Sequence, residues 1–413
     1  MIIKFSRIVL ILTVIFVLSI VVPKYYWMMF EKNHSTPLIV YSSLLKDFIY
    51  SKRDRGTIIR YDNKGKVISK KQFEALAPLY FYRSLFYFGK MPAQIDTYKV
   101  TSKSLKLNTI FTQIKPEQIS TPQIMLFPLI ESKPDGPKLQ MPNDFFRITD
   151  KMEFLDCETN TIIPDLTNRF TKALKNVGFI FPAKKIFGNP SVMKPYDDGY
   201  FVVDSKNQLF HIKRVHNNPY VKKITLPKGV IPIYIAVTEM ELREFHALLI
   251  SADSELYIIS FKNYKPIKMP IKNYDYHSMK IRFQGNPLYR VITVISDTSL
   301  SLFVTDRKYN FVDEYKETWT SKYETTAGKV LSAVFPFSLQ ITSAHSNLID
   351  FYFKFNGTIS LVGMIISLLI YIFIQRRKGE EATQCKMDYL IVFLTGFYGL
   401  IATLLIRDET WKI

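Results

Sequence analysis

The residues best suited to chemistry gather in the segment from Gly188 to Gly199, which contains Tyr196, Asp197 and Asp198. Glycine and proline punctuate this segment, and a strand-like run begins directly after it. Loops of this kind often carry binding residues, and two adjacent carboxylates can bind a cation or a basic group. The competing interpretation is that the acids only cap and turn the chain, because Asp and Pro are ordinary turn formers. We take Tyr196, Asp197 and Asp198 as candidate binding residues.

Other chemistry-bearing residues are scattered along the chain. None of the six histidines stands in an H-E-x-x-H frame or four residues from another, the spacing at which one helix face presents two zinc ligands. The chain contains no G-x-S-x-G nucleophile signature and no G-x-x-x-x-G-K phosphate loop. Its two cysteines, Cys157 and Cys385, do not form a C-x-x-C pair. We therefore expect no catalytic residue, no metal ligand and no cofactor.

The composition predicts a basic protein with a large core. Hydrophobic residues make up 47% of the 413 residues, which is far from the composition of a disordered chain. Lys and Arg number 55 against 36 Asp and Glu, a net charge of +19, but no long run of cations occurs. We interpret this excess as a solvated basic surface and expect no nucleic-acid partner.

The N-terminus has the pattern of a membrane anchor. Lys4 and Arg7 precede the apolar run Ile8–Val22, and residues 25–27 are Tyr-Tyr-Trp, side chains that gather at a membrane interface. A cleaved signal peptide would show the same charged start and apolar run. Because bulky aromatic residues rather than a small-residue cleavage site follow the run, we expect an uncleaved transmembrane helix within residues 1–30.

Two more apolar stretches lie near the C-terminus, Ile359–Ile374 and Tyr389–Ile406. The loop between them is marked as cytoplasmic by four cations, Arg376, Arg377, Lys378 and Lys386. A buried helical hairpin in a soluble protein is the alternative, but a bilayer suits these apolar flanks better. The expected order is a cytoplasmic start and transmembrane helix (1–30), an extracytoplasmic β-rich domain (31–354), a transmembrane helix (355–374), a cytoplasmic loop (375–386), a transmembrane helix (387–406) and an extracytoplasmic tail (407–413).

The middle region repeats a strand–turn–strand unit. Segments 252–259 and 296–303 share the pattern, and 201–212 is a third copy with a longer turn. Asp in such turns bonds its own backbone, which is typical of β-hairpins. With weaker copies, the turns fall at positions 54, 102, 150, 204, 253 and 297. This period favours a mainly β fold, a propeller-like domain of six or seven blades, beside three transmembrane α-helices; a large β-sandwich is the alternative.

Four stretches carry a family resemblance: Phe146–Phe154, Arg169–Lys175, Gly188–Ser191 and Lys194–Phe201. They resemble an uncharacterised family of Bacteroidetes membrane proteins, domain of unknown function 4857. The resemblance is strongest over residues 145–225 and extends weakly to the termini. It implies a Gram-negative inner membrane and association with ABC transporter components. It implies no particular activity and no catalytic residue.

Together these features predict a non-enzymatic accessory or binding protein of the bacterial inner membrane. Its N-terminus would lie in the cytoplasm and residues 31–354 in the periplasm. Its partners would be the lipid bilayer and another integral membrane protein, with ABC transporter subunits as the expected complex. Two other function classes stay open: a membrane-tethered hydrolase or lyase that acts on an envelope polymer, and a sensor subunit that passes ligand binding through the helices.

Overall fold

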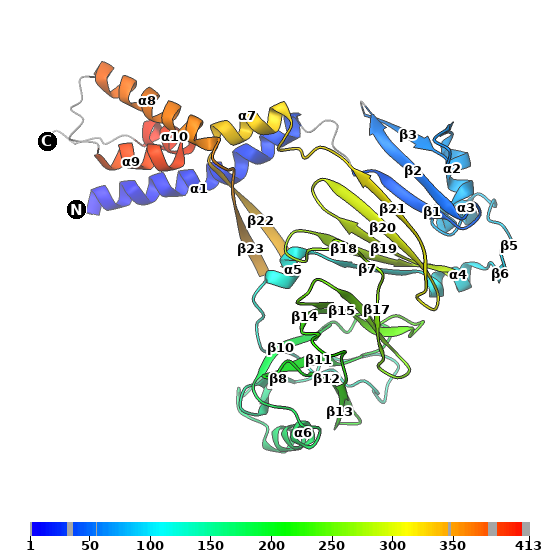
Figure 1. The fold of residues 1–413 in the computed structure, drawn as a ribbon. Coiled ribbons are helices and arrows are strands. Elements are labelled where there is room, and N and C mark those ends of the chain that lie inside the picture. Colours follow the sequence, from blue (N-terminus) through cyan, green and yellow to red (C-terminus); the bar gives the residue numbers. More distant parts are fainter. Residues whose placement is uncertain (1, 31–35, 55, 346–347, 379–385, 407–413) are drawn as a thin grey trace. The chain divides into compact units, whose positions relative to one another are not determined.

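The computed structural model describes residues 2–30, 36–54, 56–345, 348–378 and 386–406 (Figure 1). The chain divides into two compact units, which we call the helical unit and the sheet unit. The helical unit comprises Met1–Pro37, Lys52–Ile59 and Thr318–Ile413, and the sheet unit comprises Leu38–Ser51 and Arg60–Glu317. Each unit is described by itself below.

The sheet unit is built from meanders, in which each strand lies beside the next one in the chain. The first is β1 (Leu38–Ser42), β2 (Asp47–Asp54), β3 (Thr57–Tyr61) and β4 (Val67–Ile68). The second is β10 (Ala183–Gly188), β11 (Tyr200–Asp204), β12 (Leu209–Val215) and β13 (Asn218–Ile224). The third is β14 (Pro232–Val237), β15 (Phe245–Ser251), β16 (Leu256–Ser260) and β17 (Pro266–Lys268). The fourth is β18 (Lys280–Gly285), β19 (Tyr289–Ile295), β20 (Ser299–Asp306) and β21 (Phe311–Thr318).

Smaller elements connect the meanders. Strand β7 (Ile110–Ile114) pairs antiparallel with β18 and extends the fourth meander to five strands. The hairpin of β8 (Asp144–Ile148) and β9 (Met152–Asp156) packs against helix α6 (Pro164–Asn176). The remaining elements are α2 (Lys70–Leu76), α3 (Tyr82–Tyr87), β5 (Gln94–Ile95), β6 (Tyr98–Lys99), α4 (Ser102–Asn108) and α5 (Pro116–Ser120).

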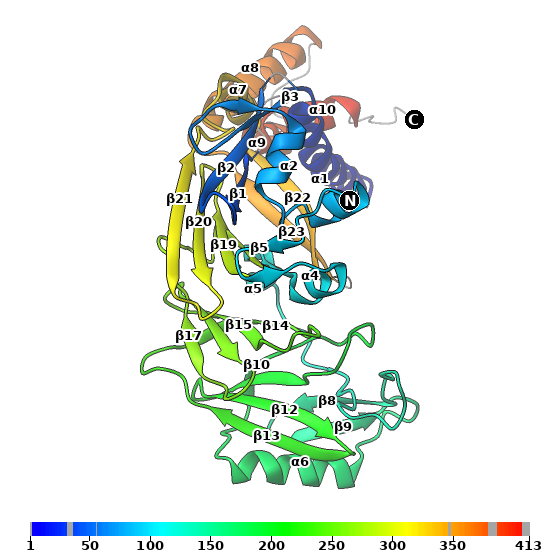
Figure 2. The same ribbon diagram turned by 90° about the vertical axis from the view of Figure 1, so that its right-hand side faces the viewer.

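The second, third and fourth meanders are stacked face to face, and alternate residues of a strand point to opposite faces. In β15, Leu248 and Ile250 face one hydrophobic core, whereas Ala247 and Leu249 face another. The first of these cores is shared with the fourth meander and the second with β11 and β12. The third meander is therefore covered on both sides, and Figure 2 shows the row from β10–β13 through β14–β17 to β18–β20.

The mainly β expectation is confirmed, and the expected hairpins at 204, 253 and 297 lie between β11 and β12, β15 and β16, and β19 and β20. The described residues, however, form no closed propeller. Ser102 begins helix α4 instead of a hairpin turn, because Thr101 and Ser104 form a capping box there. The turn at Asp150 joins β8 and β9, which form a two-stranded sheet rather than a four-stranded blade. Helices and short hairpins thus occupy the interval where two further blades were expected.

The helical unit contains two helices that could cross a membrane by length and composition, Phe5–Phe30 within α1 (Ile2–Phe30) and Ser360–Arg377 within α8 (Ser360–Lys378). The position of α1 at the N-terminus also fits a signal sequence. The unit further contains α7 (Thr326–Val334), α9 (Lys386–Thr395), α10 (Phe397–Leu405) and the hairpin of β22 (Phe337–His345) and β23 (Leu348–Phe355).

The third expected span, residues 387–406, is not one straight helix. Helices α9 and α10 meet at Gly396 and fold back on each other, so that a Cβ atom on Gly399 would lie 2.9 Å from the carbonyl oxygen of Ile391. Arg7 contacts both ends of this segment: its Nη2 lies 2.7 Å from Asp388 Oδ2, and its Nε donates to the Ile406 carbonyl at 3.1 Å. In a straight helix those two residues would be about 27 Å apart.

The backbone at Gly396 makes this turn. Its φ of 59° and ψ of −134° lie in a region that residues with a Cβ avoid. A Cβ there would also approach Pro336 Cδ to 3.2 Å. Each of the two helices, at 10 and 9 residues, reaches only about half of a ~30 Å hydrocarbon layer. The segment is thus a helical hairpin rather than a single span.

Gly396→Ala should destabilise the helical unit, because alanine is strained at this positive φ and its Cβ would crowd Pro336. We expect a loss of about 1–3 kcal/mol, seen as a lower midpoint of thermal unfolding in detergent. Gly136→Ala is the control, since Gly136 does not have positive φ and nothing lies within 4 Å of its would-be Cβ. Equal midpoints for the two variants would contradict the hairpin geometry.

Candidate functional site

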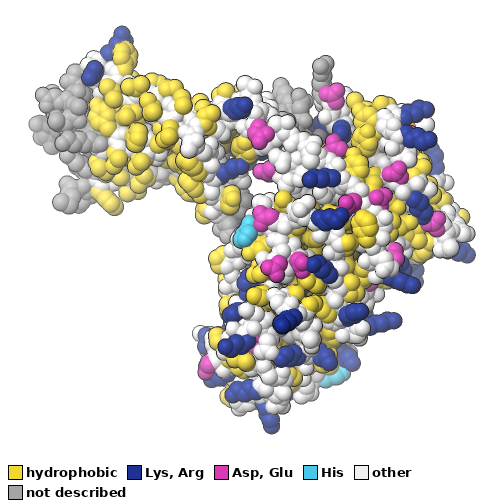
Figure 3. All heavy atoms as spheres, viewed as in Figure 1, with side chains coloured by type: hydrophobic (Ala, Val, Ile, Leu, Met, Phe, Trp, Pro, Cys, Tyr) yellow, Lys and Arg dark blue, Asp and Glu magenta, His cyan; other side chains and the backbone are white. Residues whose placement is uncertain are grey.

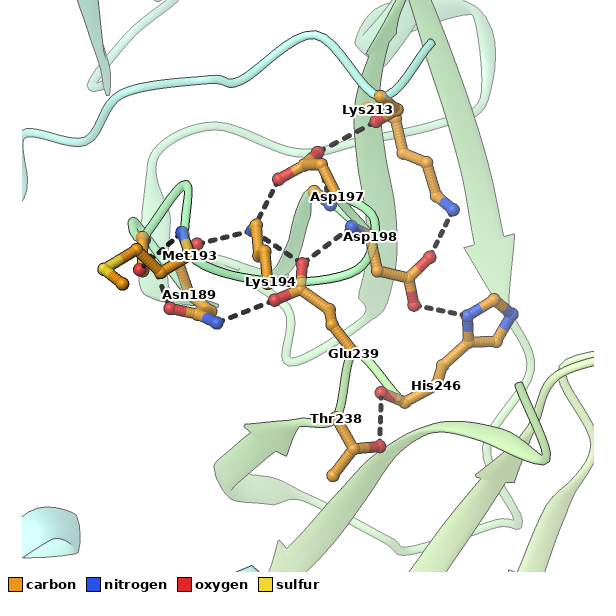
Figure 4. Close-up of polar contacts among 12 residues, drawn as sticks. Asn189, Met193, Lys194, Asp197, Asp198, Lys213, Thr238, Glu239 and His246 are labelled. Carbon is orange, nitrogen blue, oxygen red and sulfur yellow. Dashed lines mark hydrogen bonds and ion pairs between the residues drawn. The ribbon is translucent and has the colours of Figure 1, made fainter. Parts of the chain in front are cut away.

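The predicted loop folds around one buried cation, Lys194, which is 3% exposed (Figure 4). Its Nζ lies 2.7 Å from Asp197 Oδ1, 2.7 Å from Glu239 Oε1 and 2.7 Å from the carbonyl oxygen of Asn189. The loop connects β10 to β11, whereas Glu239 follows β14 in the next meander. Glu239 also accepts from the Asp198 backbone N–H at 2.7 Å and from Asn189 Nδ2 at 2.8 Å. Lys194 and Glu239 therefore join two meanders.

Asp197 uses its second oxygen within the loop. Its Oδ2 accepts from Ser132 Oγ at 2.9 Å and from the Gly199 N–H at 2.9 Å. Gly199 has a φ of 64°, and a Cβ on it would stand 2.1 Å from the Ile212 carbonyl oxygen. Glycine is thus required for the loop to approach β12. Asp197, at 2% exposed, is fully engaged in holding this turn.

Asp198 forms the second half of the cluster and is completely buried. Its Oδ2 accepts from His246 Nδ1 at 2.6 Å, and its Oδ1 pairs with Lys213. Burial alone would raise the pKa of Asp198, but the His246 hydrogen bond and the charge of Lys213 hold it below its usual value. Asp198 is therefore a buried carboxylate with its charge compensated.

His211 on β12 completes this cluster. Its Nε2 donates to the Asp198 carbonyl oxygen, and its Nδ1 accepts from the Tyr264 hydroxyl at 2.9 Å. Burial lowers the pKa of His211 to about 3, so the ring is neutral at physiological pH. His211 then serves as a fixed hydrogen-bonding group.

An Asp–His pair such as Asp198–His246 is a common general-base arrangement. Here the His246 ring is 2% exposed and stacks between Phe261 and Tyr264, at centroid distances of 4.5 and 4.4 Å. Its Nε2 is buried with no hydrogen-bond partner among the described residues. A substrate therefore has no path to this nitrogen in the structure. The pair binds one meander to the next.

Tyr196 is also turned inward, at 8% exposed. Its ring lies 4.3 Å from the Arg243 guanidinium, a cation–π contact between the loop and the turn before β15. The structure thus brings all three predicted residues together, and it uses all three to pack two sheets. In the described part of the chain, no group of three or more His, Cys, Asp or Glu side chains is placed to hold a metal ion.

A cavity of about 330 Å³ lies elsewhere in the sheet unit, and its volume suits a small ligand. We call it the aromatic cleft. It is enclosed by β1, the segment around α2 and α3, and the paired edges of β7 and β18. Its walls are largely aromatic and apolar, with a few polar groups: Tyr41, Tyr80, Tyr82, Phe111, Ile39, Ile110, Ser43, Gln284 and Asn286.

Ser43 gives the aromatic cleft an unused hydrogen-bonding group. The residue is 3% exposed, and its Oγ has no hydrogen-bond partner among the described residues. Asn286 uses its Oδ1 to accept from the N–H groups of Leu288 and Tyr289, which leaves its Nδ2 for the cleft. Buried polar groups normally have partners, so such a hydroxyl beside a cavity is suited to a ligand.

Sequence reasoning missed the aromatic cleft. Its walls come from segments around residues 41, 80, 111 and 284, which are far apart in the chain. None of these segments contains a motif, and an isolated Tyr or Gln has no local signal of a binding role. The pairing of β7 with β18, across more than 160 residues, and the ring contact of Tyr41 with Tyr289 are among the distant contacts that bring these walls together.

Replacing Lys194 tests the structural role of the ionic cluster. Lys194→Ala leaves Asp197 and Glu239 buried without their cation, so we expect a loss of about 3–5 kcal/mol in the free energy of unfolding. Denaturant unfolding, followed by far-ultraviolet circular dichroism, measures this free energy of unfolding. Lys184→Ala is the control on β10, because Lys184 is exposed and, among the described residues, hydrogen-bonds through its side chain to Asn207 Oδ1 alone, at 2.8 Å. If the loss is no larger than in the control, the cluster does not stabilise the fold.

The comparisons with known proteins identify a family. The family model described as "Domain of unknown function (DUF4857)" matches residues 38–305, more than half of the chain. No curated protein matches the chain. The matched residues run from β1 into β20 and include the Lys194 cluster and the aromatic cleft. The chain belongs to this family of domains of unknown function, DUF4857.

Proposed function

We propose that the chain is a non-enzymatic accessory protein of a bacterial inner membrane. The helical unit would anchor it, and the sheet unit would bind a small ligand in its aromatic cleft on the periplasmic side. The observation that carries the proposal is the reversed polarity of the helical unit, which has apolar side chains outside and charged ones inside. That arrangement suits lipid rather than water as the surrounding solvent.

The face of the helical unit that Figure 3 draws is largely apolar, with a few charged side chains. On α1, Leu10 and Leu12 are 54% and 52% exposed, and on α8, Leu369 and Phe373 are 59% and 58% exposed. Such a continuous exposed apolar surface is costly in water and marks a membrane or protein contact. It supports both expected partners, the bilayer and another integral membrane protein.

The interior of the same unit holds a chain of polar groups. Arg7 binds Asp388 with both of its terminal nitrogens, at 2.9 and 2.7 Å. The Tyr371 hydroxyl donates to Asp388 Oδ2 at 3.1 Å, and Gln375 Nε2 donates to that hydroxyl at 3.0 Å. Intramembrane charges are found paired and turned inward, as these are. The network ties α1, α8 and α9 together.

The orientation we propose follows from the cations. Lys4, Arg376 and Arg377 flank the two long apolar helices, and positive flanks face the cytoplasm. Because α9 and α10 form a hairpin that returns to Arg7, we place the end of α10 on the cytoplasmic side too. This differs from three straight spans, which would put residues 407–413 outside. That tail and the loop residues 379–385 lie beyond the described residues.

Thiol labelling tests the orientation. Cys157 is free and exposed in the sheet unit, so an impermeant thiol reagent should label it in intact spheroplasts of a Cys385→Ser variant. In a Cys157→Ser variant, Cys385 should react only after the membrane is broken. In a cysteine-free chain, Lys412→Cys should be protected like Cys385, whereas three straight spans would expose it. Labelling of Cys385 in sealed cells would reverse the proposed orientation.

Co-purification tests the accessory role. A tagged chain solubilised in mild detergent should bring down a second integral membrane protein in fixed proportion, as expected for a subunit associated with an ABC transporter. An unrelated single-span membrane protein with the same tag is the control. Recovery of the isolated chain, under conditions that keep known membrane complexes intact, would count against the proposal.

A further inference from the structure

The side chain of Arg282 on β18 is a half-buried cation that pairs with no carboxylate in the described part of the chain. Its Nε is buried and has no hydrogen-bond partner among the described residues. An uncompensated guanidinium donor in a protein interior is costly, and it normally meets a carboxylate, a phosphate or a carbonyl oxygen. The position of Arg282 therefore favours the binding of an anion that is not part of this chain.

Arg282 lies next to the aromatic cleft. Residues 280, 282 and 284 alternate along β18 and share one face, because Ile281 and Phe283 point into the opposite core. Gln284 on this face lines the cleft. The guanidinium is also close enough to Tyr80, a cleft residue, to lower the phenol's pKa, although burial raises it more. Arg282 is not part of the cleft lining, but it lies beside the lining residues Gln284 and Tyr80.

Further cations surround Arg282. Lys280 lies two residues away, and Lys115 follows β7, the strand that pairs with β18. Burial lowers the pKa of Lys280, and the charges of Arg282 and Lys115 lower it further, while Glu117 opposes them. Like charges this close repel one another, so a bound anion would relieve that repulsion.

We propose that the aromatic cleft and Arg282 together bind a small ligand that combines an aromatic or apolar ring with one carboxylate or phosphate group. The ring would lie among Tyr41, Tyr80 and Phe111, and the anionic group would accept from the Arg282 guanidinium. The Ser43 hydroxyl would bond a polar substituent of the ring. The proposal deepens the proposed function, since it names the ligand class of the same cleft.

The test measures binding of 2-naphthyl phosphate and 2-naphthoate to the purified full-length protein in detergent by equilibrium dialysis. Neutral 2-naphthol and inorganic phosphate are the comparison ligands. At least one naphthyl anion should bind about ten-fold or more tightly than either comparison ligand, because ring and anion then contribute together. Binding in detergent needs neither an oriented membrane nor a partner, so this result stands apart from the labelling and co-purification tests.

Variants assign the binding to the proposed residues. Arg282→Gln should weaken the naphthyl anion about ten-fold or more and leave 2-naphthol unchanged. Ser43→Ala should weaken 6-hydroxy-2-naphthoate by a few-fold and leave 2-naphthoate unchanged, because only the first ligand carries a second polar substituent. Lys222→Gln, an exposed position on β13, removes the same charge and should change nothing. Arg282→Lys keeps the charge but lacks the guanidinium, so we expect an intermediate loss of affinity. This variant also provides the test if Arg282→Gln does not fold.

Two results would overturn the proposal. One is equal affinity for naphthyl anions and 2-naphthol, which would show that the cleft recognises no anion. The other is an Arg282→Gln or Arg282→Lys protein that binds the naphthyl anions as tightly as the unaltered chain does.

Discussion

One buried cation sets the geometry of the sheet unit. Lys194 stands among two carboxylates and a carbonyl oxygen, and Glu239 reaches it from the neighbouring meander. A charge at this depth is stable only when its partners are in place, so the two meanders have one relative position in which the cluster is complete. The apolar faces of β11 and β15 supply most of the burial, but apolar contacts alone tolerate sliding. The ionic cluster, with Asp198 and His246 beside it, removes that freedom.

The same rule of compensated charge explains why the predicted loop is not a site and why the aromatic cleft is a candidate. At Asp197 and Asp198 the acceptors are satisfied by the protein's own donors, and the side chains are sealed from solvent. At the cleft, the Ser43 hydroxyl and the Arg282 Nε are buried without partners among the described residues. A polar group that has no partner in the fold and lies beside a cavity is a better indication of ligand binding than an acidic pair whose oxygens already accept hydrogen bonds within the fold.

Local signals in the sequence were sufficient for the hairpins and the long apolar helices. Asp204 bonds the backbone of its own turn, so the expected hairpin there depends on neighbouring residues alone. The turn at Ser102 failed because Thr101 caps a helix, a local signal that competes with the hairpin pattern. Closure of a propeller, the return at Gly396 and the aromatic cleft depend on contacts between distant residues, such as Arg7 with Ile406. No window of the sequence contains those contacts.

The Arg7–Asp388 pair joins residues that are 381 positions apart in the chain. During synthesis α1 leaves the ribosome before the sheet unit and Asp388 after it, so the pair can form only when the segment between them has been made. The contact between α1 and α9 therefore forms only after the sheet unit has been synthesised. A product truncated before α9 would lack Asp388, and Arg7 on α1 would then be without this carboxylate.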